Sequence, residues 1–295
     1  MSRTGIVRIG ISGWTYPPWR GVFFPKKLTH NRELEYAANT FRTLEINGTF
    51  YSLQRSSSYQ AWAERTPEDF VFSVKASRYI THLRRLKEIE VPLANFFASG
   101  ILKLGPKLGP ILWQFPPSFK YSPKLMEDFL KLLPRDTEDA VKLGKRHDHT
   151  VEGRSFVETD RNRPLRHAIE IRHASFVVPE FIALLRKHQV ALVCADAVEW
   201  PRLMDVTTDF LYCRLHGSEV LYASGYGEKA IEEWAQRVVA WATGGESKDG
   251  DFASNKKVTR QKKRDVFVYF DNDAKVRAPR DAKKLQARLA EHLPE

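Results

Sequence analysis

Short apolar segments alternate with longer amphipathic stretches along most of this chain. Each apolar segment is strand-sized and stops at a polar or charged residue. Strands that alternate with helices in this way are typical of α/β folds with a parallel sheet. The number and spacing of the segments predict a (β/α)8 TIM barrel, with strands at residues 8–13, 43–47, 70–75, 110–115, 168–172, 190–196, 210–216 and 266–271.

The stretches between these strands carry apolar residues at helical spacing. They predict helices around Trp234 and Trp241 and at residues 31–39, 57–65, 93–103, 122–133, 179–188 and 281–293. Two segments depart from the alternation, residues 134–166 before the fifth strand and residues 244–264 before the eighth. A barrel of this type typically needs about 250 residues. We therefore expect the 295 residues to form a single domain with two insertions.

Polar and charged side chains gather where the predicted strands end. The carboxyl ends of barrel strands surround one mouth, and this mouth is where such barrels carry their chemistry. Residues two apart in a strand face the same side, so Glu170 and Arg172 are expected to face inward while Ile169 and Ile171 pack outward. The strand ends supply Glu45, Asn47, Lys75, Gln114, Glu170, Arg172, Asp196, Arg214, His216, Asp271, Asn272 and Asp273.

The seventh strand repeats this alternation. Arg214 and His216 are expected on its inner face, and Cys213 and Leu215 on its outer face. A buried charge without a partner is costly, so charges that alternate with aliphatic residues need an explanation. They form either an active site or a set of interior salt bridges that hold the barrel together, and both interpretations stay open at this point.

The ionisable residues at the mouth favour acid/base chemistry on an anion. Lys75, Arg172 and Arg214 suit a phosphate or a carboxylate as a clamp. Glu170 is expected to act as general base or acid, with His216 as its proton-transfer partner. Further acid/base groups are Glu45 and Asp196, and further substrate-binding residues are Asn47, Tyr51, His82, Gln114, Tyr226 and Asn272. The predicted function is hydrolysis or isomerisation of a phosphorylated sugar or a nucleotide-like compound.

A divalent metal ion is an alternative use of the same mouth. The oxygen and nitrogen ligands would be Glu45, Glu170, Asp196, His216 and Asp271. The neighbouring lysine and arginines would repel such an ion and neutralise its carboxylates. We therefore predict no cofactor and keep the metal site as an alternative.

An aromatic, proline-rich segment follows the first strand. Trp14, Tyr16 and Trp19 are expected in a loop at the mouth. Such rings can stack on a sugar or a base, or they can cap the barrel as an apolar lid. The sequence leaves both possibilities open.

The chain is basic, with a net charge of +11 and a pI near 9.6. The run from Lys256 to Arg264 contributes six of these charges, which leaves an ordinary +5 for the remainder. We interpret this run as a solvated loop, with electrostatic attachment to nucleic acid as the alternative. A protein that binds nucleic acid or an anionic ligand without turnover is accordingly the second function hypothesis.

The remaining features indicate a protein of the cytoplasm. No apolar stretch approaches the roughly 18 residues of a membrane span, and the start of the chain lacks the pattern of a secretory signal. Cys194 and Cys213 lie in separate predicted strands without metal-ligand spacing, so we expect reduced packing residues. The oligomeric state is not predicted.

Ordered motifs along the whole chain resemble the YecE-like family, domain-of-unknown-function family 72. They are GISGW at residues 10–14, LEINGTFY at 44–51, VKA at 74–76, ITH at 80–82, WQFPP at 113–117, EIRH at 170–173, RLHG at 214–217 and YFDND at 269–273. The resemblance implies a TIM barrel whose polar residues gather at one mouth, and it implies no settled reaction. At the level of fold the family is similar to the sugar-isomerase and endonuclease-IV-like barrels. The segment before His167 and the basic loop before Asp265 depart from shorter members.

Overall fold

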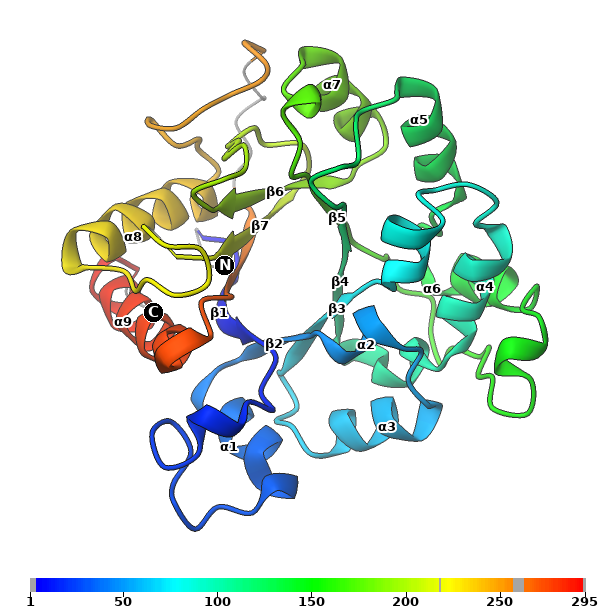
Figure 1. Ribbon diagram of the computed structural model, residues 1–295, viewed down its shortest axis with the longest axis horizontal. Helices are drawn as coiled ribbons and strands as arrows, with labels where there is room; N and C mark the ends of the chain where they lie inside the picture. The colour runs from blue at the N-terminus through cyan, green and yellow to red at the C-terminus, as the bar shows by residue number, and fades with distance from the viewer. Residues whose placement is uncertain (1–3, 218, 257–262, 294–295) are drawn as a thin grey trace.

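Eight parallel strands close into a barrel in the order β1 to β8, and Figure 1 looks into this ring with helices arranged around it. The computed structural model describes residues 4–217, 219–256 and 263–293. Each strand lies within two residues of its predicted bounds, so the predicted (β/α)8 barrel is confirmed. The strands are β1 Val7–Ser12, β2 Thr43–Ile46, β3 Val71–Lys75, β4 Leu108–Gln114, β5 His167–Glu170, β6 Ala191–Asp196, β7 Phe210–Leu215 and β8 Asp265–Phe270.

The longer helices cover the outside of the barrel, whereas the short α2 lies at its mouth, with Phe50 beside Lys75 (Figure 1). Pro123 and Pro179 occupy the first turns of α5 and α7, where a residue without a backbone N–H is tolerated. The helices are α1 Glu33–Thr40, α2 Gly48–Tyr51, α3 Ser56–Glu64, α4 Glu90–Ala98, α5 Pro123–Leu132, α6 Thr137–Gly144, α7 Pro179–Lys187, α8 Glu228–Ala242 and α9 Arg277–His292.

The predicted helix at residues 93–103 is divided by a turn. Helix α4 ends at Ala98, and a 3₁₀ segment, Ile101–Lys107, follows it. Gly100 between them has φ 112°, in the region that favours glycine, and a Cβ atom there would lie 2.4 Å from Ser56 Cα. This close approach to the start of α3 explains why the helix does not continue.

Two apolar clusters confirm the predicted alternation of the strands. Ile169, Ile171, Cys213 and Leu215 belong to the large cluster between the strands and the helices. A smaller cluster fills the interior of the barrel and includes Tyr212 on the inner face of β7. Because the interior is packed in this way, the polar chemistry is confined to the mouth.

The first insertion and the described part of the second lie on the outside of the barrel (Figure 1). The first contains α6, and it is tied to α4 by the Asn95 amide, which donates to Asp148 Oδ1 at 2.9 Å. The described part of the second is held by Asp205, whose carboxylate accepts from the backbone of Ala253 and Ser254. Residues 257–262, the centre of the predicted basic run, lie outside the described residues. Arg264, at the end of the run, is buried and donates to Gly245 O at 2.6 Å, so the prediction of a solvated loop is wrong for this residue.

Both cysteines, Cys194 on β6 and Cys213 on β7, are buried and free, as expected from their sequence context. Within the described ranges, no helix has the length and apolar character needed to cross a membrane.

Candidate functional site

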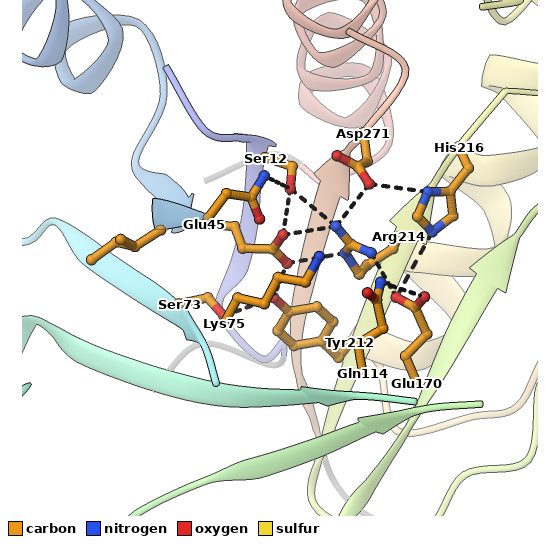
Figure 2. A network of polar contacts seen from close by, with 12 residues as sticks. Ser12, Glu45, Ser73, Lys75, Gln114, Glu170, Tyr212, Arg214, His216 and Asp271 are labelled. Atoms are coloured by element: carbon orange, nitrogen blue, oxygen red, sulfur yellow. Dashed lines mark hydrogen bonds and ion pairs between the residues drawn. The ribbon is translucent and has the colours of Figure 1, made fainter. Parts of the chain in front are cut away.

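Arg214 is the centre of a buried polar network at the carboxyl end of the barrel (Figure 2). Its Nη1 donates to Glu170 Oε2 at 2.7 Å, and its Nη2 donates to Asp271 Oδ2 at 2.8 Å. Nη2 also donates to Glu45 Oε1 at 2.9 Å and to Ser12 Oγ at 3.1 Å, while Nε donates to Glu45 Oε2 at 3.1 Å. These bonds occupy the guanidinium of Arg214, which therefore positions carboxylates and has no exposed surface for a substrate.

Glu170 and Asp271, two of the carboxylates around this arginine, are held in the ionised form. Burial of Glu170 opposes ionisation, but the charges of Arg172 and Arg214 outweigh it and hold its pKa well below the usual range. The pKa of Asp271 is lowered for the same reason, with Arg214 as the main opposing charge. Glu170 also accepts from Gln114 Nε2 at 2.9 Å and from Arg172 Nε at 2.7 Å. Glu170 is consequently a well-satisfied anion at neutral pH.

His216 lies between two of these carboxylates. Its Nδ1 is 3.1 Å from Asp271 Oδ2 and its Nε2 is 3.8 Å from Glu170 Oε2, although neither contact has hydrogen-bond alignment. The rings of Trp200 and Tyr222 stand edge-on to the imidazole, with centroids 5.1 and 5.4 Å away. Together they leave His216 fully buried, so the predicted Glu170–His216 pair lies beneath a cover of aromatic rings.

Lys75, at the end of β3, is a cation at the mouth without a carboxylate partner among the described residues. Figure 2 shows its side chain extending toward the Arg214 network. Among the described residues, no hydrogen bond or ion pair reaches Nζ, which lies 4.3 Å from the centre of the Phe50 ring. Burial, followed by the positive charge of Arg214, lowers the pKa of Lys75 to about 8. The amine therefore exists in both protonation states near neutral pH.

Arg172 is a second cation at the mouth whose terminal nitrogens form no hydrogen bond to a described residue. Only its Nε is bonded to a described residue, Glu170, and its guanidinium carbon lies 3.6 Å from the centre of the Trp200 ring. The side chain is 11% exposed, and its terminal nitrogens bind no described residue. Stacking on tryptophan fixes the plane of the guanidinium, which is the arrangement that suits bidentate binding of an anion.

His82 and Arg78 extend this cationic region. The His82 ring packs edge-on to Phe50 at 5.0 Å, and the Arg78 guanidinium lies 5.5 Å from the Tyr51 ring. Burial, with the charges of Lys75 and Arg172 next, lowers the pKa of His82 to about 4, so its imidazole is neutral. The region thus combines uncompensated positive charge with a neutral imidazole and a phenol.

Asp196 belongs to a different cluster. Its Oδ1 accepts from Arg202 at 3.0 Å, and its Oδ2 accepts from Tyr226 at 2.9 Å and from Trp234 on α8 at 3.3 Å. Asn272 turns away as well, because its amide donates to Asp281 on α9 at 2.9 Å. The structure therefore does not bring Asp196, Tyr226 and Asn272 into the Arg214 network.

A pocket of about 520 Å³ opens beside the mouth, at the ends of β1 and β2. Asn47 lines it; its Nδ2 donates to Ser12 Oγ at 3.0 Å, while its Oδ1 is buried without a hydrogen-bond partner among the described residues. Trp14 and Tyr51 also line the pocket, whereas Trp19 is fully buried against the Tyr16 ring at 4.5 Å. The aromatic segment therefore divides between a pocket wall and a packed cap.

Several members of the site were absent from the prediction. Tyr212 donates to Glu45 Oε2 at 2.5 Å, Ser12 donates to Glu45, and Phe50 and Trp200 lie against the two cations. Tyr212 precedes Arg214 by two residues, so the alternation that found Arg214 also points to it. No comparable signal in the sequence places Phe50 or Trp200, since their position depends on loop conformation.

The described residues contain no group of at least three histidine, cysteine, aspartate or glutamate side chains arranged to hold a metal ion. In the set considered from the sequence, Glu45, Glu170 and Asp271 bind Arg214, and Asp196 lies apart. The donor set therefore does not converge on one point as metal ligands must.

Comparison with known proteins finds relatives named as UPF0759 proteins. The chain is 30% identical over 122 residues to UPF0759 protein YunF of Bacillus subtilis, covering 39% of this chain and 41% of the relative. It is 28% identical over 140 residues to UPF0759 protein YecE of Escherichia coli K12, covering 47% of this chain and 48% of the relative. The matches thus span less than half the length of these relatives.

Solved structures share the fold over nearly the whole chain. A DUF72 family protein of Thermotoga maritima matches with a TM-score of 0.69 and 24% identity, covering 96% of this chain and 99% of that one. A DUF72 family protein of Enterococcus faecalis matches with a TM-score of 0.69 and 18% identity, covering 96% and 95%. Residues 8–295 also match the family described as Protein of unknown function DUF72, and the chain therefore belongs to the DUF72 family.

Proposed function

We propose that this protein is an enzyme that binds an anionic, sugar-like substrate at the barrel mouth and hydrolyses or isomerises it by acid/base chemistry. The observation that carries the proposal is the pair of cations, Lys75 and Arg172, whose nitrogens lack carboxylate partners among the described residues except at Arg172 Nε. A phosphate or carboxylate group of a substrate supplies the missing partner.

The other charged residues divide between positioning and proton transfer. Arg214 orients Glu45, Glu170 and Asp271 and does not contact the substrate, since its guanidinium nitrogens already donate to these carboxylates. A group whose pKa lies near the working pH transfers protons best, which favours Lys75, with a pKa of about 8, over the strongly ionised Glu170. Glu170 then acts mainly by fixing the Arg172 side chain.

The pocket beside the mouth accommodates the uncharged part of the substrate. Trp14 offers an aromatic wall, and Asn47 Oδ1, which has no hydrogen-bond partner in the described part of the chain, accepts a hydrogen bond from a hydroxyl group. This combination of an aromatic surface and an amide is typical of sites that bind sugars or nucleosides.

Thermal-shift measurements against phosphorylated sugars, nucleotides and short oligonucleotides test the proposal, because a ligand that binds only the native state raises the melting temperature. We expect stabilisation by a small phosphorylated compound that is lost in Arg172→Ala. The matched control is Arg42→Ala, an exposed arginine with a 3.2 Å ion pair to Asp69, which should leave the shift unchanged. A compound that passes both criteria is then assayed for conversion by NMR.

Two outcomes contradict the proposal. Stabilisation by oligonucleotides alone, lost when the segment from Lys256 to Arg264 is deleted, supports binding without turnover at the basic run. Stabilisation that is insensitive to Arg172→Ala places the ligand away from the mouth.

A further inference from the structure

The surroundings of Lys75 differ from those of an ordinary lysine. The side chain is only 8% exposed, and its ammonium lies over the Phe50 ring. Carboxylates are close by, but Glu45, Glu170 and Asp271 are each bonded to Arg214. The strand end therefore keeps an amine close to carboxylates without pairing it with any of them.

A lysine in this position lowers the stability of the fold, and a structural role does not explain why it is there. Burial of a charged amine without a partner is unfavourable, and an apolar side chain of similar length would pack there without that penalty. Burial beside another cation is one of the ways in which a lysine amine is made nucleophilic. Arg214, whose Nη1 is fixed at 2.7 Å from Glu170 Oε2, is such a neighbouring cation.

We propose that Lys75 Nζ is a covalent nucleophile that forms an imine with the carbonyl carbon of an anionic aldehyde or ketone. This inference rests on the proposed function and narrows its substrate to compounds with a free carbonyl group. Arg172, with terminal nitrogens that are unbonded among the described residues, holds the anionic end of the same molecule.

The step balances without an oxidant or another co-reactant. The lone pair of the neutral amine attacks the carbonyl carbon, a C–N bond forms, and the carbonyl oxygen becomes the hydroxyl group of a carbinolamine. Loss of that hydroxyl as water, with the protons taken from the amine and solvent, leaves the imine. The imine withdraws electrons from the adjacent carbon, which is what an isomerisation through proton removal requires.

Reductive trapping tests this inference. The protein is incubated at neutral pH with glycolaldehyde phosphate or dihydroxyacetone phosphate and sodium cyanoborohydride, and the modified peptides are located by mass spectrometry. We expect an adduct at Lys75 whose added mass is that of the carbonyl compound less one oxygen atom. The adduct should be lost in Lys75→Arg, since a guanidinium keeps the charge but stays protonated and does not attack carbonyls.

Lys103 is the matched control, because its ammonium also lies over a phenylalanine ring, Phe156 at 4.1 Å, but outside the mouth. Lys103→Arg should leave the Lys75 adduct unchanged. Peptide mapping of the wild type decides the question even where Lys75→Arg does not fold.

An adduct spread over surface lysines without preference for Lys75, or no adduct at all, overturns the inference. If stabilisation by the same compounds still depends on Arg172, the proposed function stands and only the covalent step fails. If that stabilisation is absent too, the proposed function and the covalent step both fail.

Discussion

Replacement of Lys75 by methionine should stabilise the protein at neutral pH. Methionine has a similar length and shape, and it removes a buried ammonium whose contact with the described residues is the Phe50 ring at 4.3 Å. The charged groups that act on this amine are Arg214, which disfavours the charge, and Asp271, Glu45 and Glu170, which favour it. Burial and the charge of Arg214 together outweigh the three carboxylates, so the pKa of Lys75 is lowered.

The magnitude follows from the pKa. A decrease from the usual 10.5 to about 8 in the folded protein corresponds to about 3 kcal/mol between the two protonation states. Below pH 8 both the folded and the unfolded chain carry the proton, so the folded state bears the full penalty. Between pH 8 and 10.5 the unfolded chain binds more protons, and stability therefore rises with pH.

Urea unfolding of wild type and Lys75→Met between pH 7 and 10.5 measures this difference. The variant should be more stable by up to about 3 kcal/mol at pH 7, and the advantage should disappear by pH 10.5. Other titrating groups are common to both proteins and cancel in the comparison. A difference that is constant across this range, or a variant less stable than wild type at pH 7, refutes the reasoning.

Three further outcomes are expected. Arg214→Met should lower the free energy of unfolding by about 3–5 kcal/mol, because the substitution leaves buried carboxylates without their partner. Arg42→Gln, at an exposed ion pair, should change the free energy of unfolding by less than about 1 kcal/mol. Urea titrations of the two variants and the wild type measure both effects. Asp271 has a lowered pKa, so its contribution is present above its usual pKa of 3.8 and is lost as pH falls below it; Asp271→Asn should flatten the acid limb of a stability–pH profile. Cys194 and Cys213 are both buried, and burial raises the pKa of the Cys213 thiol. Because iodoacetamide cannot reach buried thiols, both should react only in denaturant, as mass spectrometry would show; labelling of the native protein would contradict their burial.

The sequence by itself determined the barrel and most of the residues at its mouth. Strand positions follow from apolar runs and inward positions from a period of two, and both are local properties imposed by burial. For this reason the sequence pattern places Glu170 and Arg214 on the inner faces of β5 and β7. The turn at Gly100 was missed, because it depends on the contact with Ser56, far away in the sequence.

Only the tertiary structure decided which charges neutralise one another. Lys75, Arg172 and Arg214 look equivalent as cations at strand ends. Arg214 nevertheless binds Glu45, Glu170 and Asp271, while Lys75 binds no carboxylate among the described residues. The tertiary structure likewise decides the partner of Asp196, whose carboxylate accepts a hydrogen bond from Trp234 on α8. Ion pairing depends on the reach and direction of side chains across the barrel, which sequence spacing does not encode. The sequence pattern therefore predicts which residues lie at the mouth, whereas side-chain packing determines which of them are available for chemistry.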